Sequence, residues 1–177
     1  EDLQALTSTQ MRALSSDQLQ SLSVTQITGL TSAQVAALTT TQVQALTTSQ
    51  LNALESEDLQ ALSATQMRSL TSDQLAALSV DQVPLLTTTQ VAALTTSPVQ
   101  FLSTTQLNAL ETEDLQALTS GQISGLSSDQ LNALDTSYLQ VLTTSQVRGI
   151  QVGQLSGLST SQVQALTSSQ VEALSAT

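Results

Sequence analysis

Hydrophobic residues recur along this chain with a period of eight. Leucine stands at Leu6, Leu14 and every eighth position thereafter up to Leu174, with Ile150 as the single replacement. The 168 residues from Thr7 to Leu174 therefore form 21 octads, with positions labelled a (Thr7 in the first) to h (Leu14). Position e is Met, Leu, Ile or Val in every octad. A repeat this strict is the unit from which the fold must be built.

The polar positions of the octad predict where a helix begins. Position a is Ser or Thr in 17 octads and position d is Gln in 17. A hydroxyl residue followed three positions later by Gln is the pattern of a capping box. The apolar residues at h of one octad and e of the next then occupy the two positions of a hydrophobic staple. Each octad is therefore predicted to contain one short helix that starts at b.

The placement of charge supports this register independently. Acidic side chains favour the first turn of a helix and basic ones the last, because of the helix dipole. Of the 14 acidic residues, 13 fall at a, c or d when the frame is extended back over Glu1 and Asp2; Glu172 is the exception. All three arginines fall at f, near the predicted helix end.

We predict an all-α solenoid of very short capped helices, one per octad. A single long helix is excluded, because 3.6 residues per turn would rotate the apolar stripe by ~80° per octad. Helices this short need partners, so e and h should meet in a shared core, with two or three octads per coil. Small residues at g should let neighbouring backbones approach closely. A β-solenoid is the alternative, supported by the Thr and Val content but not by the adjacent apolar g and h positions.

Two prolines test the helical interpretation. Pro84 lies at f, where it removes an amide that a helix needs, so the octad unit is predicted to hold only about a turn of helix, partly 3₁₀. Pro98 lies at d, in a first turn whose amides are unpaired in any case, and should be tolerated.

The whole chain, 1–177, is predicted to be one octapeptide-repeat solenoid with 21 full octads over 7–174. A longer period is also present, because Glu57 to Leu62 returns 56 residues later at Glu113 to Leu118. Seven octads therefore form a block. Both ends of the sequence cut through octads, and we expect the chain to be a piece of a longer array.

Composition excludes several functions. A formal charge of −11 with only three cationic residues argues against nucleic acid as a partner, since phosphates are bound by Lys and Arg. Apolar runs are far shorter than the ~18 residues of a membrane span. Ser and Thr are abundant, but no His, Lys or Cys is present to activate them. We therefore predict no enzyme, no catalytic or cofactor-binding residue and no cofactor.

One acidic cluster is a weak candidate for a metal site. Carboxylates at a, c and d could bind a hard cation such as Ca²⁺. The simpler interpretation is that these acids complement the helix dipole, and we predict no metal. The candidate residues are Glu55, Glu57, Asp58, Glu111, Glu113 and Asp114.

The octads over 39–46 (TTTQVQAL) and 159–166 (STSQVQAL) resemble the Leu-[Ser/Thr]-x-x-Gln-[Val/Leu]-x-Ala arrays of very large, secreted, adhesin-like bacterial proteins. This resemblance implies an extracellular or cell-surface location and a role as stalk, spacer or filament segment. Self-association is expected, because solenoid ends expose core residues. The alternative is a binding module whose repeated Ser/Thr/Gln surface recognises polysaccharide or ice.

Overall fold

The computed structural model describes residues 3–175, apart from the side chains of Pro98 and Ser175, so Glu1 and Asp2 lie outside the described residues. Short helices follow one another at octad spacing along the whole described chain. They are η1 Leu3–Ala5, α1 Ser8–Ala13, α2 Ser16–Gln20, α3 Val24–Thr28, α4 Ser32–Ala37, α5 Thr40–Ala45, α6 Thr48–Asn52, α7 Ser56–Ala61, α8 Ala64–Ser69, α9 Ser72–Ala77, η2 Val83–Leu85, α10 Thr88–Ala93, α11 Thr96–Val99, α12 Thr104–Ala109, α13 Thr112–Ala117, α14 Ser120–Gly125, α15 Ser128–Asn132, α16 Thr136–Val141, α17 Thr144–Arg148, α18 Val152–Ser156, α19 Thr160–Ala165 and α20 Ser168–Ser175.

The predicted capping box starts most of these helices. In α5, the hydroxyl of Thr39 accepts from the backbone N–H of Gln42 at 3.2 Å, and the Gln42 side-chain oxygen accepts from the Thr39 N–H at 2.8 Å. Where Glu55, Glu111 or Asp135 stands at a, the side chain makes no capping bond. The all-α prediction is confirmed, and the β-solenoid alternative is wrong, since residues 3–175 contain no strand.

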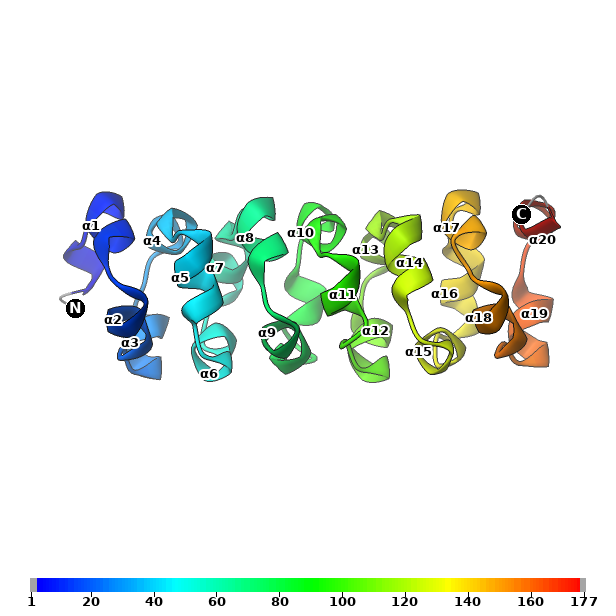
Figure 1. Cartoon of the computed structure of the whole chain (residues 1–177), viewed down its shortest axis with the longest axis horizontal. Helices are drawn as coiled ribbons and strands as arrows, with labels where there is room; N and C mark the ends of the chain where they lie inside the picture. Colours follow the sequence, from blue (N-terminus) through cyan, green and yellow to red (C-terminus); the bar gives the residue numbers. More distant parts are fainter. Residues whose placement is uncertain (1–2, 176–177) are drawn as a thin grey trace.

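Successive coils stack into a rod (Figure 1) with the termini at opposite ends. Helices three octads apart pack together, as α1 does with α4 and α4 with α7. Hydrogen bonds between coils join residues 25, 28 and 31 positions apart, centred on 28 residues or 28/8 = 3.5 octads. The packing of helices three octads apart agrees with the upper of the two values predicted, two or three octads per coil.

The core runs along the axis of the rod and is built from positions e and h. In the central octad of α9, for example, Leu75 is 0% exposed and Leu78 is 3% exposed. Buried side chains of this kind form one cluster from Met11 to Ala173. Because each octad contacts mainly the coils before and after it, stability is distributed along the array rather than concentrated in one centre.

A second set of contacts joins the coils through the glutamines at d. In α9, the Gln74 side-chain amide donates to the carbonyls of Val43 and Leu46, each at 2.8 Å. The same pair of bonds, to carbonyls 31 and 28 residues earlier, recurs at each d glutamine from Gln34 to Gln170. These side chains are at most 7% exposed. We call this set of bonds the glutamine ladder.

Both proline octads contain a helical turn. Pro84 falls in η2, a 3₁₀ turn that replaces the α-helix found in the neighbouring octads. Helix α11 runs from Thr96 to Val99 and so passes through the position of Pro98. None of the helices described is long and apolar enough to cross a bilayer.

Candidate functional site

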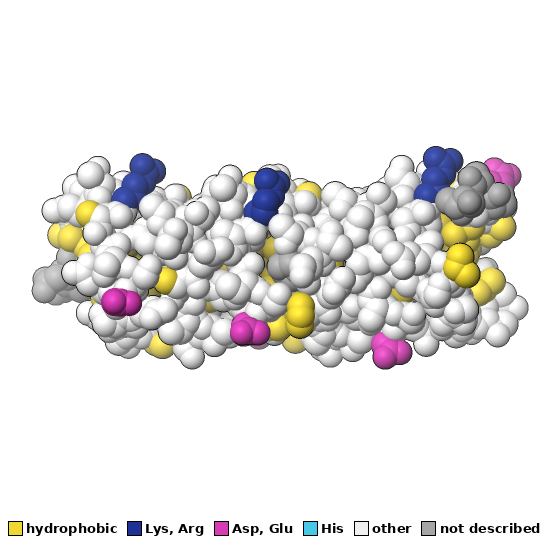
Figure 2. All heavy atoms as spheres, viewed as in Figure 1, with side chains coloured by type: hydrophobic (Ala, Val, Ile, Leu, Met, Phe, Trp, Pro, Cys, Tyr) yellow, Lys and Arg dark blue, Asp and Glu magenta, His cyan; other side chains and the backbone are white. Residues whose placement is uncertain are grey.

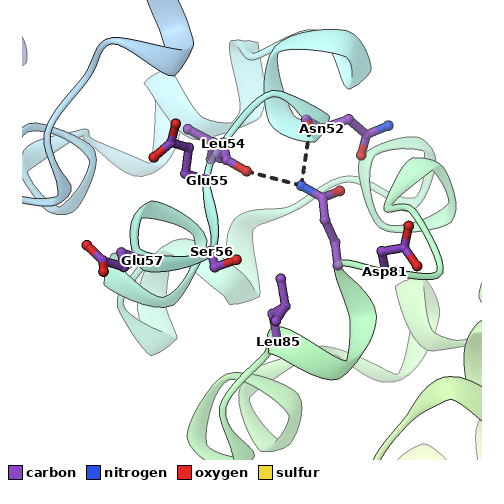
Figure 3. Close-up of a pocket in the computed structure, with 8 residues that line it drawn as sticks. Asn52, Leu54, Glu55, Ser56, Glu57, Asp81 and Leu85 are labelled. Carbon is purple, nitrogen blue, oxygen red and sulfur yellow. Dashed lines mark hydrogen bonds between the residues drawn. The ribbon is translucent and has the colours of Figure 1, made fainter.

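The larger groove described here lies between two coils, where α6 and α7 face η2 (Figure 3). Its volume is about 490 Å³. Acidic side chains stand at its rim and carbonyl-bearing backbone forms its floor. The lining residues are Asn52, Leu54, Glu55, Ser56, Glu57, Asp81, Gln82 and Leu85.

The groove lies where the glutamine ladder is weakest. The Gln82 amide reaches the carbonyls of Leu51 and Leu54 at 3.4 Å and that of Asn52 at 3.3 Å. The bonds of Gln74 to the equivalent carbonyls are 2.8 Å long. Because Pro84 follows two residues later and shortens the helix, Gln82 sits farther from the preceding coil. The groove is thus a consequence of one imperfect octad.

The acidic side chains do not converge within this groove. Glu55 and Glu57 are exposed, and in Figure 3 their carboxylates point away from Asp81. Asp58 turns inward, is 5% exposed, and accepts a hydrogen bond from the Ser32 hydroxyl at 2.8 Å. Within residues 3–175, no three His, Cys, Asp or Glu side chains are grouped in a way that could hold a metal ion.

The second copy of the acidic cluster differs from the first in its surroundings. Glu111 and Glu113 are exposed like Glu55 and Glu57, and Asp114 is buried, with 4% of its surface exposed. Burial raises the pKa of Asp114 from the usual 3.8 to about 6, and the negative charges of Glu111 and Glu113 add to the effect. The pKa of the Asp114 carboxyl group is thus raised toward neutrality.

Tyr138 occupies the position that corresponds to Gln82, one 56-residue block later. Its hydroxyl donates to the carbonyl of Asn108 at 2.9 Å, and its ring packs against the core. The Asn108 carbonyl corresponds to that of Asn52, which Gln82 reaches only at 3.3 Å. Tyr138 is therefore a local replacement for a ladder glutamine.

A smaller groove of about 310 Å³ lies beside Arg12. The Arg12 Nε donates to the carbonyl of Ala37 at 3.0 Å, so the guanidinium is held against the next coil. Figure 2 shows the cationic side chains along one long edge of the rod, with most of the visible surface uncharged. Several f residues, including Gln20 and Asn52, make the same 25-residue contact. Position f is exposed, and it also carries hydrogen bonds between coils.

A comparison with protein families accounts for the repeat itself. A family model described as the ALTTAQ repeat matches residues 1–32, 18–48, 27–56, 51–88, 107–144 and 139–176. The chain belongs to the ALTTAQ repeat family. A search of curated proteins finds no match.

The six letters of the ALTTAQ repeat span positions g to d, as in Ala37 to Gln42 (ALTTTQ). In the structure, the leucine is a core residue, the first threonine is the N-cap and the glutamine forms both the cap and the ladder. The unmatched stretch 89–106 contains Pro98, one of the four departures from Gln at d. The residues of the family motif are thus the ones that make the contacts between an octad and the neighbouring coil.

Sequence reasoning missed the ladder, although a signal for it was present. A capping box accepts either Glu or Gln at its last position. Only the amide of Gln can also donate a hydrogen bond. In this acidic chain, no octad has Glu at d. The preference for Gln over Glu at position d indicates that a hydrogen-bond donor is needed there. The capping box alone does not require such a donor.

Proposed function

We propose that the chain is a structural module: a stalk, spacer or filament segment of an extracellular bacterial protein. The observation that carries the proposal is the continuity of the rod. One core cluster and one recurring pair of ladder bonds extend over almost the whole described chain. A protein built this way adds length with each added octad while its cross-section stays constant.

The exposed surface favours the same role. The acids of the larger groove diverge, and the lining of both grooves is made of the same octad positions that recur throughout the array. The net charge of −11 keeps like-charged neighbours apart and helps such a rod to stay extended in solution. We therefore propose that the chain is not an enzyme and that it acts by its length.

Length is the quantity to measure. Proteins with one, two and three copies of the 56-residue block 57–112 inserted in register should differ in maximum dimension by equal increments in small-angle X-ray scattering. Equal increments are expected because each block adds the same seven octads. A radius of gyration that follows the compact-protein scaling of about N^0.38 would contradict the stalk proposal.

The proposed location needs a separate experiment. Antibody raised against the folded chain should label intact cells of the producing organism, without permeabilisation. Labelling that appears only after the cells are opened would contradict an extracellular location while leaving the rod itself unaffected.

A binding function is the second candidate, favoured by the exposed hydroxyls next to the grooves. Ser56 lines the larger groove, and Thr39, Thr40, Ser63 and Thr65 line the smaller one. Such hydroxyls can pair with the hydroxyls of a polysaccharide or with ice. A glycan array and a thermal hysteresis measurement test this candidate, and no signal in both would reject it.

A further inference from the structure

The three arginines of the chain lie along one edge of the rod, which is built from helices without acidic residues. Arg12, Arg68 and Arg148 are exposed residues of α1, α8 and α17. Figure 2 shows the cationic side chains along this edge, whereas most acidic side chains in the same view lie toward the opposite edge. The helices of the edge pack against one another or follow one another directly in the chain. They are α1, α4, α5, α8, α10, α11, α14 and α17, and we call their surface the arginine edge.

The separation of charges allows an acidic chain to attract an anion. The net charge is −11, yet every Asp and Glu between residues 3 and 175 lies in an octad outside the arginine edge. Acids that lie farther than roughly 8 Å from a bound anion are largely screened by physiological salt. An anion at the arginine edge therefore meets the guanidinium groups first.

The smaller groove opens on the arginine edge, between α1, α4, α5 and α8. Its volume of about 310 Å³ is near the lower end of the ~300–1,000 Å³ range of small-molecule sites, which suits a single sugar unit. No acidic side chain lines it. The capping boxes of α5 and α8 use the hydroxyls of Thr39 and Ser63. The hydroxyls of Thr40 and Thr65, which also line the groove, are not part of these caps and can bond to a ligand.

The backbone of the next coil holds the Arg12 guanidinium at this groove. Its Nε donates to the carbonyl of Ala37 at 3.0 Å. This bond uses only the Nε–H, so the terminal amino groups of the guanidinium remain for a ligand. A planar guanidinium pairs with a carboxylate through parallel hydrogen bonds. The groove thus combines a positioned cation, which suits a carboxylate, with hydroxyls, which suit a sugar.

The residues of the groove recur one 56-residue block later on the same edge. The corresponding pairs are Arg12 and Arg68, Thr39 and Thr95, Thr40 and Thr96, Ser63 and Thr119, and Gln66 and Gln122. The ladder geometry is also repeated, because Gln66 and Gln122 each donate to the carbonyl 28 residues earlier at 2.8 Å. One hydroxyl is lost, since Gly121 replaces Thr65. The arginine edge therefore offers similar groups at two places along the rod.

We propose that the arginine edge binds a linear polysaccharide that carries carboxylate groups. The Arg12 guanidinium pairs with one carboxylate, and the hydroxyls of Thr40 and Thr65 bond to hydroxyls of the same polymer. Arg68 engages a second carboxylate farther along, so the two places act together. A thin polymer can enter the groove, whereas a second rod of this chain would span it. The proposal rests on the binding function, the second candidate above, and specifies its ligand.

Calorimetric titration of the full chain with polygalacturonate at pH 7.5 and low salt tests the ligand class. The fully methyl-esterified polymer is the matched control, because it has the same backbone without the charge. It should bind at least about tenfold more weakly, since bonds to charged groups are the stronger ones. Short oligomers should also bind more weakly than the polymer, because they cannot reach both places. Equal binding of the acid and the ester would overturn the proposal.

Variants of the arginines test the site itself. Arg12→Gln keeps a donor for the Ala37 carbonyl, as Gln20 provides at the same octad position, so the fold should be retained. Binding should weaken about tenfold, and it should be lost when Arg68→Gln is added. The matched control combines Arg12→Gln with Gln20→Arg, which restores the net charge but places the cation on α2, outside the arginine edge. Wild-type affinity in this control would overturn the proposal, because net charge alone would then explain binding.

X-ray scattering on the same samples separates this inference from the stalk function. The dimensions of the rod should be the same in the wild type and the variants. A wild-type rod that does not bind polygalacturonate would overturn the inference and leave the stalk function intact. Binding of neutral glycans alone would keep the second candidate function and overturn the arginine edge as its site. Self-association that is lost in Arg12→Gln, without polygalacturonate binding, would assign the edge to a second copy and would also overturn the proposal.

Discussion

The glutamine ladder can be tested by one isosteric substitution at two places. Gln74 is 3% exposed and bonded to the preceding coil, whereas Gln18 is exposed and its amide nitrogen contacts no carbonyl of the described residues. Both side-chain oxygens accept the N–H of their own N-cap, at 2.9 Å for Gln74 and 2.8 Å for Gln18. Substitution by Glu preserves size and this capping acceptor. It removes only the donor, so the two variants differ mainly in the ladder.

The expected magnitude follows from what Gln74→Glu loses. Two bonds to buried carbonyls are removed, each with a net contribution of about 0.5–1.5 kcal/mol. The new carboxylate would also face those carbonyls, and an acceptor left without a donor costs a further ~1–3 kcal/mol. We therefore expect Gln74→Glu to cost about 2–6 kcal/mol at neutral pH. Gln18→Glu should change stability by less than about 0.5 kcal/mol, because an exposed acid in the first turn suits the helix dipole.

The assay is urea unfolding followed by circular dichroism at 222 nm, at pH 7.5. Because long repeat arrays can unfold in more than one step, amide hydrogen exchange near Val43 and Leu46 should accompany it. In Gln74→Glu these amides should lose protection, and in Gln18→Glu they should not. Equal unfolding midpoints for the two variants would refute the idea that the ladder holds the coils together.

Two further predictions concern the core and the close contacts between coils. Leu94→Asp places a carboxylate in a site that is 5% exposed, and it should cost several kcal/mol of stability. Leu174→Asp, at a half-buried site, should cost less, and Gln100→Asp, at an exposed site, least of all. Equal melting temperatures for the Leu94 and Gln100 variants would mean that position h does not face a core. Gly149→Ala should destabilise the chain, because the new Cβ would overlap the Ser120 backbone. At Gly153 a new Cβ would meet no atom within 4 Å, so Gly153→Ala should raise the stability of the chain by up to about 1 kcal/mol. The reverse order of melting temperatures would contradict the packing of α17 on α14.

The local structure of this protein could be predicted from the octad alone. Hydroxyl at a, Gln at d and aliphatic residues at e and h are all contacts within one octad or across its boundary, and they place each helix start to the residue, as at Thr39 and Thr71. The effect of Pro84 was equally local and therefore predictable. The spacing of the apolar positions and of the capping residues depends only on the backbone geometry of a few consecutive residues.

The stacking of the octads depends on contacts between coils. The number of octads per coil is set by small rotations at each connection, which add up over about 28 residues and are not visible in an eight-residue pattern. For the same reason, the ladder partners of Gln74 could not be predicted from the repeat, because they lie 28 and 31 residues away. Asp58 and Asp114 have the same place in the octad and in the 56-residue block. The Ser32 hydroxyl donates to Asp58, whereas Asp114 has Thr88 at the corresponding place, so the two carboxyl groups differ in what the preceding coil offers them.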